Sequence, residues 1–342
     1  MVRKWKWYAC LLALCGWVAL GMTACSDEEP EPDPDPTETE TETGTDGTES
    51  DKGEEPKPEG GGGEVTAEAG TDSLELTFVR DELKIYGWMY RPKAVQGRLP
   101  AVILSHSHSL THAAMKGYAR MLADKGFAAY CYDFCGGSTQ SQSDGNPDDM
   151  TLFTEMADLK AVLSGVKGLD YVDASRIFLL GSSEGGLVSA LTAEEVSGEV
   201  AGMVLFYPAF TLPDLVNQFA SFGGMGGFPG MGGSSMGLSE AYVAALKGYD
   251  AYAHIGSFAR PILMLLGTED FLVKQADLEK AVAKYANGNA TLQMIEGANH
   301  GFNKANLGDM GAMMGGFIQI KECDDVVMPL VYAFLDECLK AL

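Results

Sequence analysis

The sequence has few basic residues for its length. Its 342 residues include 24 Lys and Arg against 48 Asp and Glu, which gives a formal net charge of −24. Proteins that bind phosphate backbones or anionic lipid surfaces do so through clustered positive charge. Residues 65–342 alone carry a net charge of −13. This balance excludes nucleic acid as a partner and gives the folded region no electrostatic attraction to a membrane.

Cysteines are also scarce and are poorly spaced for metal or redox sites. Of the seven, three lie within the first 25 residues, so four remain further along the chain: Cys131, Cys135, Cys323 and Cys338. No pair among these four has CxxC spacing, which argues against a zinc knuckle and against a thioredoxin-type site. An exported protein permits disulfides, but the spacing leaves open whether any of the four forms one.

The N-terminus lacks an apolar run long enough for a lasting transmembrane helix, which needs about 20 residues. Residues 1–25 instead combine a basic start, an apolar run of about a dozen residues and a short exit of small residues, the layout of a secretory signal. The exit Met22-Thr23-Ala24-Cys25 resembles a bacterial lipobox, in which the cysteine becomes the lipidated first residue. The acidic residues after it resemble the export signal of surface lipoproteins in the Bacteroidetes. We therefore expect a surface-exposed outer-membrane lipoprotein anchored only through Cys25; the alternative is an ordinary cleaved signal with an incidental cysteine.

Residues 26–64 contain no apolar residue able to seed a core. They include 16 acidic residues and two lysines among many prolines, threonines and glycines. Such a composition is typical of a disordered segment. We expect a flexible acidic linker that spans on the order of 35 Å and holds the folded part clear of the membrane.

From residue 65 to residue 342, strand-like and helix-like segments alternate, which is the pattern of a parallel sheet covered on both faces. Residues 73–79 and 83–92 predict an antiparallel hairpin at one edge. Further strands are expected at 100–105, 127–134, 176–181, 201–207, 261–267 and 291–297, with helices near 112–125, 151–166 and 326–341.

Two segments rich in Gly and Met, 221–237 and 307–317, break this alternation. Neither has much fixed backbone preference. The first belongs to an insertion at about 208–258. We expect this insertion to be a lid that covers a site, and a surface loop without a role is the alternative.

The segment RIFLLGSSEGGLVSALTAEE places the pattern GxSxG between a buried strand and a helix. In a nucleophile elbow, the central serine occupies a strained turn between these elements, and flanking glycines, here Gly181 and Gly185, keep side chains away from it. Ser183 stands at the centre of the pattern and Ser182 at its second position. The sequence therefore predicts Ser183 as the nucleophile, with a glycine-rich structural turn as the alternative.

A serine nucleophile needs a general base and an acid that orients the base. In this arrangement both follow the serine in the order Ser, acid, His. His300 directly follows a predicted strand, where a loop can reach over the sheet, whereas His254 precedes one, so we predict His300 as the base. The turn Gly-Thr-Glu-Asp after the preceding strand resembles the acid turn of such enzymes, with Asp in fourth place. We predict Asp270 as the acid, with Glu269 as the alternative.

Three of the five histidines lie in HSHSLTH, residues 106–112. This segment follows a predicted strand at the position from which such a fold contributes an oxyanion donor. We predict the backbone N–H groups of His108 and Glu184 as the oxyanion hole, where loss of one donor can cost roughly a hundredfold to a thousandfold in rate. A metal site is the alternative. No Asp or Glu lies within the cluster and a serine triad is complete without it, so we expect no metal and no cofactor.

Together these segments resemble the α/β-hydrolase fold esterases of the cinnamoyl or feruloyl type. The likeness covers nearly all of residues 72–342 and rests on LPAVILSH, YDFCGGSTQSQSDGNPDDMT, IFLLGSSEGGLVSAL, PILMLLGTEDFLV and IEGANHGF. The resemblance implies a mostly parallel central sheet with helices on both faces. It also implies the triad Ser183, Asp270 and His300, and a lid at the insertion 208–258.

Two departures from this family bear on the site. Relatives usually have HGFGG where this chain has His-Ser-His-Ser-Leu at 106–110, and often GHSQGG where it has GSSEGG. Loss of the glycine at position 107 removes easy access to positive φ, so we expect the loop to follow another path. Glu184 brings a carboxylate toward a developing oxyanion unless its side chain pairs elsewhere.

The sequence thus predicts a serine carboxylic-ester hydrolase that acts through an acyl-enzyme on a small-molecule or oligosaccharide ester. The resemblance and the expected location favour feruloyl, cinnamoyl or acetyl esters of plant polysaccharides. The alternatives are a peptidase-like amide hydrolase of the same fold, a catalytically decayed glycan-binding lipoprotein and a metal-dependent hydrolase. The sequence does not specify the acyl group, the alcohol group or the oligomeric state.

Overall fold

The computed structural model of the chain describes residues 70–94, 97–221, 238–285, 287–303 and 323–342. The predicted signal (1–25), the acidic linker (26–64), the segment 307–317 and nearly all of 221–237 lie outside the described residues. Within the described part, no helix is long and apolar enough to cross a membrane.

The described strands form one eight-stranded sheet in the order β1-β2-β4-β3-β5-β6-β7-β8. The strands from β3 to β8 are parallel, whereas β2 runs antiparallel to both β1 and β4. Their bounds are β1 Thr71–Arg80, β2 Leu83–Pro92, β3 Leu99–Ser105, β4 Ala128–Tyr132, β5 Val172–Ser182, β6 Gly202–Phe206, β7 Ile262–Gly267 and β8 Ala290–Ile295. The predicted edge hairpin and the mostly parallel sheet are both confirmed.

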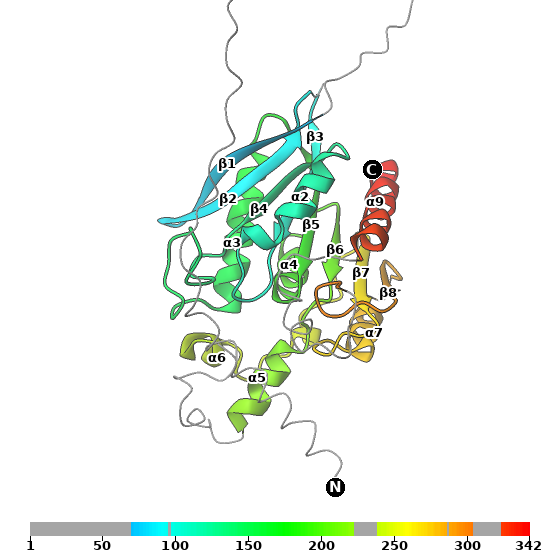
Figure 1. Cartoon of the computed structure of the whole chain (residues 1–342). Helices are drawn as coiled ribbons and strands as arrows, with labels where there is room; N and C mark the ends of the chain where they lie inside the picture. The colour runs from blue at the N-terminus through cyan, green and yellow to red at the C-terminus, as the bar shows by residue number, and fades with distance from the viewer. Residues whose placement is uncertain (1–69, 95–96, 222–237, 286, 304–322) are drawn as a thin grey trace, which may run out of the picture. The chain divides into compact units, whose positions relative to one another are not determined.

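Helices cover both faces of this sheet (Figure 1). On one face, α3 (Leu152–Lys167) packs against α4 (Glu184–Glu195). On the other face lie α2 (Lys116–Ala123) and α9 (Asp324–Ala341), where Tyr332 Oη donates to the backbone carbonyl of Met121 at 3.3 Å. The helix α7 (Gln275–Lys284) connects β7 to β8. The predicted helix near 112–125 is divided into a short 3-10 turn, η1 (His112–Ala114), and α2.

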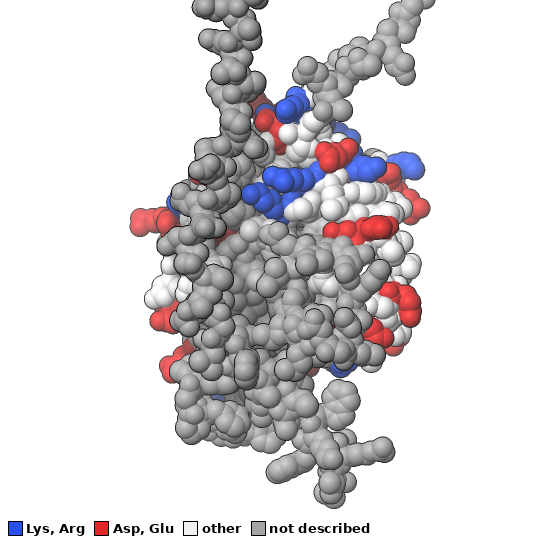
Figure 2. All heavy atoms as spheres, in the orientation of Figure 1, with Lys and Arg blue, Asp and Glu red and all other residues white. Residues whose placement is uncertain are grey.

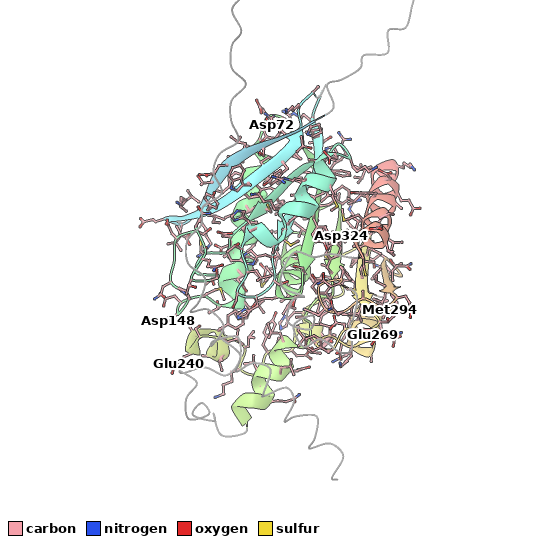
Figure 3. The ribbon with its side chains drawn as sticks, in the orientation of Figure 1. Asp72, Asp148, Glu240, Glu269, Met294 and Asp324 are labelled. Carbon is pink, nitrogen blue, oxygen red and sulfur yellow. The ribbon has the colours of Figure 1, made fainter. Side chains whose placement is uncertain are left out.

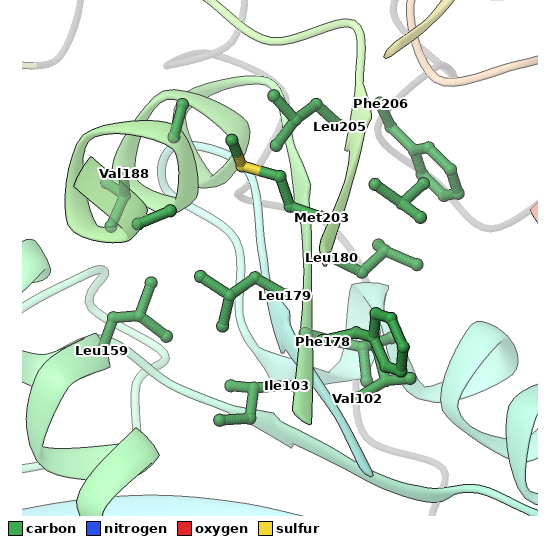
Figure 4. Close-up of a cluster of buried hydrophobic side chains, with 14 of the residues drawn as sticks. Val102, Ile103, Leu159, Phe178, Leu179, Leu180, Val188, Met203, Leu205 and Phe206 are labelled. Carbon is green, nitrogen blue, oxygen red and sulfur yellow. The ribbon is translucent and has the colours of Figure 1, made fainter. Parts of the chain in front are cut away.

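The core explains the continuous apolar runs of the central strands, because both faces of each strand are buried. Successive side chains of a strand point to opposite faces, and Figure 4 shows the two resulting groups. On one face, the strand side chains Ile103, Leu179 and Met203 lie with Leu159 of α3 and Val188 of α4. The opposite group includes Val102, Phe178, Leu180 and Phe206.

The insertion 208–258 leaves the sheet after β6. Its described part contains α5 (Leu212–Ser221), α6 (Glu240–Ala245) and the 3-10 turn η3 (Ala251–Ala253). The side chain of Asn217 joins α5 to the residues after α6, because it donates to the carbonyl of Leu246 at 3.0 Å and accepts from the N–H of Gly248 at 2.8 Å. Glu194 of α4 accepts from the backbone N–H groups of residues 256–258 and so anchors the end of the insertion.

The two ends of the described domain can be identified in the figures. Figure 2 shows basic and acidic side chains side by side at the end near β1, β2 and β3. Figure 3 shows Asp72, at the start of β1, at this end of the molecule, and Glu240 and Glu269 at the opposite end. Glu269 follows the last residue of β7 by two positions, so this opposite end is where the parallel strands finish. In open α/β sheets, ligand sites lie at that end.

The cysteines of the domain form no disulfide in the described residues. All four are buried and carry thiols: Cys131, Cys135, Cys323 and Cys338. The pairing that the sequence left open is therefore absent from this part of the chain.

Candidate active site

Ser183 occupies the sharp turn between β5 and α4. Its backbone has φ 51° and ψ −115°, a conformation that residues other than glycine rarely adopt and that stores strain. Its N–H donates to the carbonyl of Phe206 at 2.9 Å, and its own carbonyl accepts from the N–H of Ala209 at 2.9 Å. Ser183 is partly exposed, whereas Ser182 is buried. The turn therefore has the features predicted for a nucleophile elbow centred on Ser183.

Two glycines permit this turn. A Cβ added to Gly181 would lie 2.2 Å from the carbonyl oxygen of Gly185, and a Cβ added to Gly185 would lie 2.4 Å from the carbonyl oxygen of His106. Neither distance leaves room for a side chain. The second contact also shows that the loop after β3 lies directly against the start of α4.

His300 lies between Ser183 and Asp270. Its Nε2 is 3.2 Å from Ser183 Oγ, and its Nδ1 is 2.8 Å from Asp270 Oδ2. The side chains of His300 and Asp270 are buried. When Nδ1 carries the proton and donates it to the carboxylate, Nε2 is left to accept from the serine hydroxyl. The structure thus brings together the three residues that the sequence predicted as a triad.

The second oxygen of Asp270 is held by the backbone. Oδ1 accepts from the N–H of Leu272 at 2.8 Å and from the N–H of Val273 at 2.9 Å. These two donors fix the plane of the carboxylate, so that Oδ2 faces His300. The carboxylate of Asp270 is thus oriented by its own turn as well as by His300.

Glu269 and His254, the other acid and histidine that the sequence offered, are not part of the series Ser183, His300 and Asp270. Glu269 is exposed and its neighbour Asp270 takes the contact with His300. His254 is exposed at the end of η3, where its ring stacks on Tyr249 with 4.6 Å between centroids. The preference for Asp270 and His300 over these two residues agrees with the geometry.

The loop that carries His300 is shaped by close contacts that the sequence did not predict. A Cβ added to Gly267 would lie 2.1 Å from the carbonyl oxygen of Ala298, so the acid turn and the histidine loop approach each other only because residue 267 is glycine. The ring of Tyr207 lies 4.4 Å from the ring of His300 between centroids. Tyr207 and Phe302 both adopt positive φ, at 39° and 61°.

The three histidines of the HSHSLTH segment turn to three different partners. His106 is buried, its Nδ1 is 2.8 Å from the carbonyl oxygen of Ser107, and its Nε2 accepts from the N–H of Phe134 at 3.3 Å. Burial lowers the pKa of His106, so its ring is neutral. The Nδ1 of His112 is 2.7 Å from Asp133 Oδ1. Among the residues described, no group of three or more His, Cys, Asp or Glu side chains is arranged to hold a metal ion.

Asp133 joins the histidine segment to the polar loop 136–149. Its Oδ1 accepts from the backbone N–H of His112 at 2.6 Å as well as from the ring, and its Oδ2 accepts from the N–H of Gln142 at 2.8 Å. Burial alone would raise the pKa of Asp133, but the hydrogen bonds from His112 and Gln142 hold it below its ordinary value. Asp133 is therefore a structural anion that the sequence reasoning did not single out.

The side chain of Glu184 pairs with groups outside the triad. Its Oε2 is 2.9 Å from His108 Nδ1, its Oε1 accepts from the hydroxyl of Tyr242, and the side chain is 2% exposed. Burial alone would raise the pKa of Glu184, but His108 and Tyr242 together lower it, so the group is a carboxylate. The Glu184 side chain therefore pairs with His108 and Tyr242, which was the arrangement needed to keep its charge from a developing oxyanion. The assignment of the His108 and Glu184 amides as oxyanion donors stays a prediction.

In the loop after β3, the residue with positive φ is Ser109 and not Ser107, the position at which the resemblance leads one to expect glycine. Ser109 has φ 58°, and Ser107 is absent from the residues with positive φ. The turn closes with a hydrogen bond from the N–H of Leu110 to the carbonyl of Ser107 at 3.1 Å. Ser107 Oγ also lies 2.9 Å from Ser182 Oγ, next to the nucleophile. Side-chain contacts of this kind hold a loop that has no glycine.

The sequence reasoning missed Glu155 and Tyr242, which extend the contacts of Glu184. The Tyr242 hydroxyl lies 3.3 Å from Glu155 Oε2, and Glu155 is 1% exposed. Glu155 falls on the buried face of α3 with Leu152 and Leu159. An acid within the apolar stripe of a helix is a signal that the sequence did offer. Tyr242 follows the Gly/Met-rich segment and had no such signal.

One protein-family model matches part of this chain. A family model described as serine aminopeptidase, S33, matches residues 98–226, from β3 through the elbow into the insertion. No curated protein sequence matches the chain significantly.

Solved structures of similar fold include Est1E from Butyrivibrio proteoclasticus and the esterase Pf2001 from Pyrococcus furiosus. Est1E with ferulic acid bound is 23% identical, covers 66% of this chain and 90% of its own, and has a TM-score of 0.55. A second structure of Est1E is 20% identical, covers 78% and 99%, and has a TM-score of 0.58. The Pyrococcus esterase is 18% identical, covers 79% and 92%, and has a TM-score of 0.54. At these identities the likeness is one of fold.

Proposed function

We propose that this chain, which has the α/β-hydrolase fold, is a serine hydrolase that cleaves carboxylic esters through an acyl-enzyme. The observation that supports this most is the continuous series from Ser183 Oγ to His300 Nε2 at 3.2 Å and from His300 Nδ1 to Asp270 Oδ2 at 2.8 Å. The serine stands on a strained elbow at the end of the sheet where the parallel strands finish. Nucleophile, base and acid therefore follow one another in the order that acyl transfer requires.

In the proposed reaction, His300 Nε2 takes the hydroxyl proton of Ser183 while Oγ attacks the ester carbonyl carbon. Asp270 keeps the imidazole in the tautomer with Nδ1–H and stabilises the imidazolium that forms. The tetrahedral intermediate collapses when the bond to the alcohol oxygen breaks, and that oxygen leaves with the proton from Nε2. Water then attacks the acyl-serine by the same route and releases the acid.

The proposed oxyanion donors are the backbone N–H groups of His108 and Glu184. Glu184 is the first residue of α4, and an α-helix leaves its first N–H groups without carbonyl partners inside the helix. The contact between Gly185 and the carbonyl of His106 brings the loop of His108 to the same helix end. Two amides from different segments can thereby face one developing charge.

The proposed substrates are small-molecule or oligosaccharide esters with feruloyl, cinnamoyl or acetyl groups. Two facts support this choice: the sequence resembles esterases of that type, and a protein of the same fold, Est1E, has been solved with ferulic acid bound. The insertion 208–258 is the proposed lid. Its helix α6 reaches the elbow through the contact of Tyr242 with Glu184.

A second candidate is an amide or peptide hydrolase that uses the same triad. The family model that matches residues 98–226 is described as serine aminopeptidase, and the acylation chemistry is shared. The two candidates differ in the leaving group, which is an alcohol oxygen in the ester and an amine nitrogen in the amide. An unprotonated amine is the poorer leaving group, so cleavage of an amide depends more strongly on the proton that His300 donates.

The test measures turnover of p-nitrophenyl acetate, methyl ferulate and amino-acid p-nitroanilides by the purified protein, with and without a serine-directed phosphonate. Ester turnover, a phosphonate adduct mapped to Ser183 and a loss of at least about a thousandfold in Ser183→Ala are expected. Preferential cleavage of the anilides would favour the peptidase. Absence of both turnover and adduct would favour a decayed binding protein, and activity that a chelator abolishes but Ser183→Ala spares would favour a metal-dependent hydrolase.

We further propose that the chain is exported and anchored through a lipid on Cys25, with residues 26–64 as the acidic linker. Support comes from the order of basic, apolar and small residues before Cys25 and from the acidic residues after it. The wild-type protein is expected to partition into a detergent phase, and Cys25→Ala is expected to lose that partition. Protease added to intact cells is expected to remove the wild-type protein from their surface. Unchanged partition of Cys25→Ala would refute the anchor.

A further inference from the structure

Four side chains from four separate segments meet beside the proposed nucleophile. They are Glu155 of α3, Tyr242 of α6, Glu184 of α4 and His108 of the loop after β3. The Tyr242 hydroxyl lies 3.3 Å from Glu155 Oε2 and donates to Glu184 Oε1, while Glu184 Oε2 lies 2.9 Å from His108 Nδ1. Glu155, Glu184 and Tyr242 are 1%, 2% and 0% exposed, and His108 is 27% exposed in its side chain. The proposed triad uses none of these side chains.

These contacts favour one assignment of protons among Glu155, Tyr242 and Glu184. Tyr242 has a single hydroxyl proton and faces two carboxyl groups. Because that proton goes to Glu184, the contact with Glu155 needs a proton on Glu155, which then donates to the Tyr242 oxygen. Two ionised carboxylates buried around one hydroxyl would repel each other without water to separate them. Asp158, the other buried acid of α3, is paired with Arg80 Nε at 2.5 Å.

The pKa values of the two glutamates are shifted in directions that agree with this assignment. Burial raises the pKa of Glu155 well above its ordinary value, and the charge of Glu184 raises it further. The pKa of Glu184 is lowered in spite of burial, because His108 and Tyr242 stabilise its charge. These opposite shifts favour a proton on Glu155 and a negative charge on Glu184.

We propose that Glu155, Tyr242, Glu184 and His108 form a directional hydrogen-bond chain. In this chain Glu184 is a positioning residue for the oxyanion loop, which is the loop after β3 that carries the proposed oxyanion donor His108. This inference rests on the proposed function. Glu155 donates to Tyr242, Tyr242 donates to Glu184, and the Nδ1–H of His108 donates to the same carboxylate. A single carboxylate therefore holds the insertion through Tyr242 and the oxyanion loop through His108.

The position of Glu184 in the chain makes this link effective. Glu184 follows Ser183 directly, so its side chain ties the loop to the segment that carries the nucleophile. The loop has a serine rather than a glycine at its positive-φ position, Ser109, and it therefore needs side-chain contacts to hold that conformation. The hydroxyl pair of Ser107 and Ser182 provides one contact, and the pair of His108 and Glu184 provides the other.

The kinetic test compares variants of the two partners with p-nitrophenyl acetate. His108→Ala removes the donor and is expected to lower kcat at least about tenfold with little change in KM, because a displaced oxyanion amide acts mainly in the transition state. His108→Asn places an amide N–H near the position of Nδ1 and is expected to recover most of this loss. Glu184→Gln is expected to lower kcat similarly, and the double variant with His108→Ala to be no slower than the slower single variant.

The insertion supplies a matched control. Tyr242→Phe removes the hydroxyl that donates to Glu184 and is expected to lower kcat. Tyr252→Phe removes a buried hydroxyl from the same insertion, one that donates to the carbonyl of Asp277 at 3.2 Å, and is expected to keep the kcat of the wild type. Circular dichroism checks that each variant folds. If Glu184→Gln does not fold, the pair His108→Ala and His108→Asn makes the same comparison at a partly exposed position.

The proton order has a test that does not depend on turnover. Infrared difference spectra between the wild type and Glu155→Gln at neutral pH are expected to show the carbonyl stretch of a protonated carboxyl group, and its absence overturns the proposed chain. An inactive wild type that the phosphonate does not label refutes the proposed function and the positioning role with it. An active wild type whose His108→Ala and Glu184→Gln variants are as fast as Tyr252→Phe, or whose losses add in the double variant, overturns the positioning role alone.

Discussion

Replacement of Asp270 by asparagine isolates the role of the acid, because the surrounding backbone dictates how the new side chain must lie. Two N–H groups, from Leu272 and Val273, donate to Asp270 Oδ1 at 2.8 and 2.9 Å. Only an oxygen can accept from them, so the carbonyl oxygen of the introduced asparagine takes that position and its amide NH₂ faces His300 Nδ1. An NH₂ group can only donate, which forces Nδ1 to be unprotonated and places the ring proton on Nε2.

This change of tautomer affects His300 Nε2, the atom that faces the Ser183 hydroxyl. In the wild type, Nε2 lies 3.2 Å from Ser183 Oγ and can accept its proton. In Asp270→Asn the same nitrogen already carries a proton and cannot act as a base. A wrong tautomer of this kind costs about 10⁴ in kcat, which is about 5.5 kcal/mol of activation free energy.

The assay is kcat for p-nitrophenyl acetate together with the rate of phosphonate labelling, and both are expected to fall. Glu269→Gln is the control, because it makes the same change of charge one residue earlier at an exposed position. It is expected to keep nearly all activity. Retention of more than a tenth of wild-type kcat by folded Asp270→Asn, or an equal loss in Glu269→Gln, would refute the reasoning.

Three further predictions concern stability and thiol chemistry. Gly185→Ala places a Cβ 2.4 Å from the carbonyl oxygen of His106 and is expected to lower the free energy of unfolding in urea by about 1–3 kcal/mol or more. The control Gly117→Ala lies in an open position of α2 and is expected to raise this free energy by up to about 1 kcal/mol. Equal urea midpoints of unfolding for the two variants would contradict the contact. Because the pKa of Glu155 is raised by burial, the folded state keeps a proton that the unfolded state loses above the ordinary value of 4.5, so stability falls as pH rises from there toward the raised pKa. The Tm of Glu155→Gln relative to wild type should therefore increase from pH 5 to pH 8, and a constant difference would argue against a buried neutral carboxyl. The thiols of Cys131, Cys135 and Cys338 should react with Ellman's reagent at pH 8 only after denaturation, since burial raises their pKa values to about 12, about 12 and about 11. Rapid reaction at any of these three positions in the folded protein, located by mass spectrometry, would contradict their burial.

The sheet and the grouping of Ser183, His300 and Asp270 were predictable because the sequence patterns that mark them are local. The run Ile177 to Leu180 has the pattern of a buried strand because each residue meets one of two covered faces. The GxSxG pattern itself marks the elbow, although the structure shows that a Cβ at Gly181 would meet the nearby Gly185 carbonyl, whereas one at Gly185 would meet the carbonyl of the distant His106. The order Ser183, Asp270, His300 follows from the order of the strands. No knowledge of side-chain packing was needed for these assignments.

The surroundings of the triad could not be read in the same way. His108 and Glu184 are 76 residues apart, and Glu184 and Tyr242 are 58 apart. Their contacts depend on how α3, α4 and α6 pack, which no local periodicity specifies. The left-handed conformations of Tyr207 and Phe302 are also outside sequence reasoning, because residues of this type rarely adopt them.

By itself, the sequence determined the alternation of strands and helices, the serine at the elbow and the order of the proposed acid and base along the chain, because backbone propensity and the burial of both strand faces leave local patterns. Only the tertiary structure decided that the histidine segment divides its rings among separate partners and that Glu184 pairs with His108 and Tyr242. Burial supplies the physical reason. A carboxylate removed from water must find its partners among the groups that packing brings to it, and those partners come from distant parts of the chain.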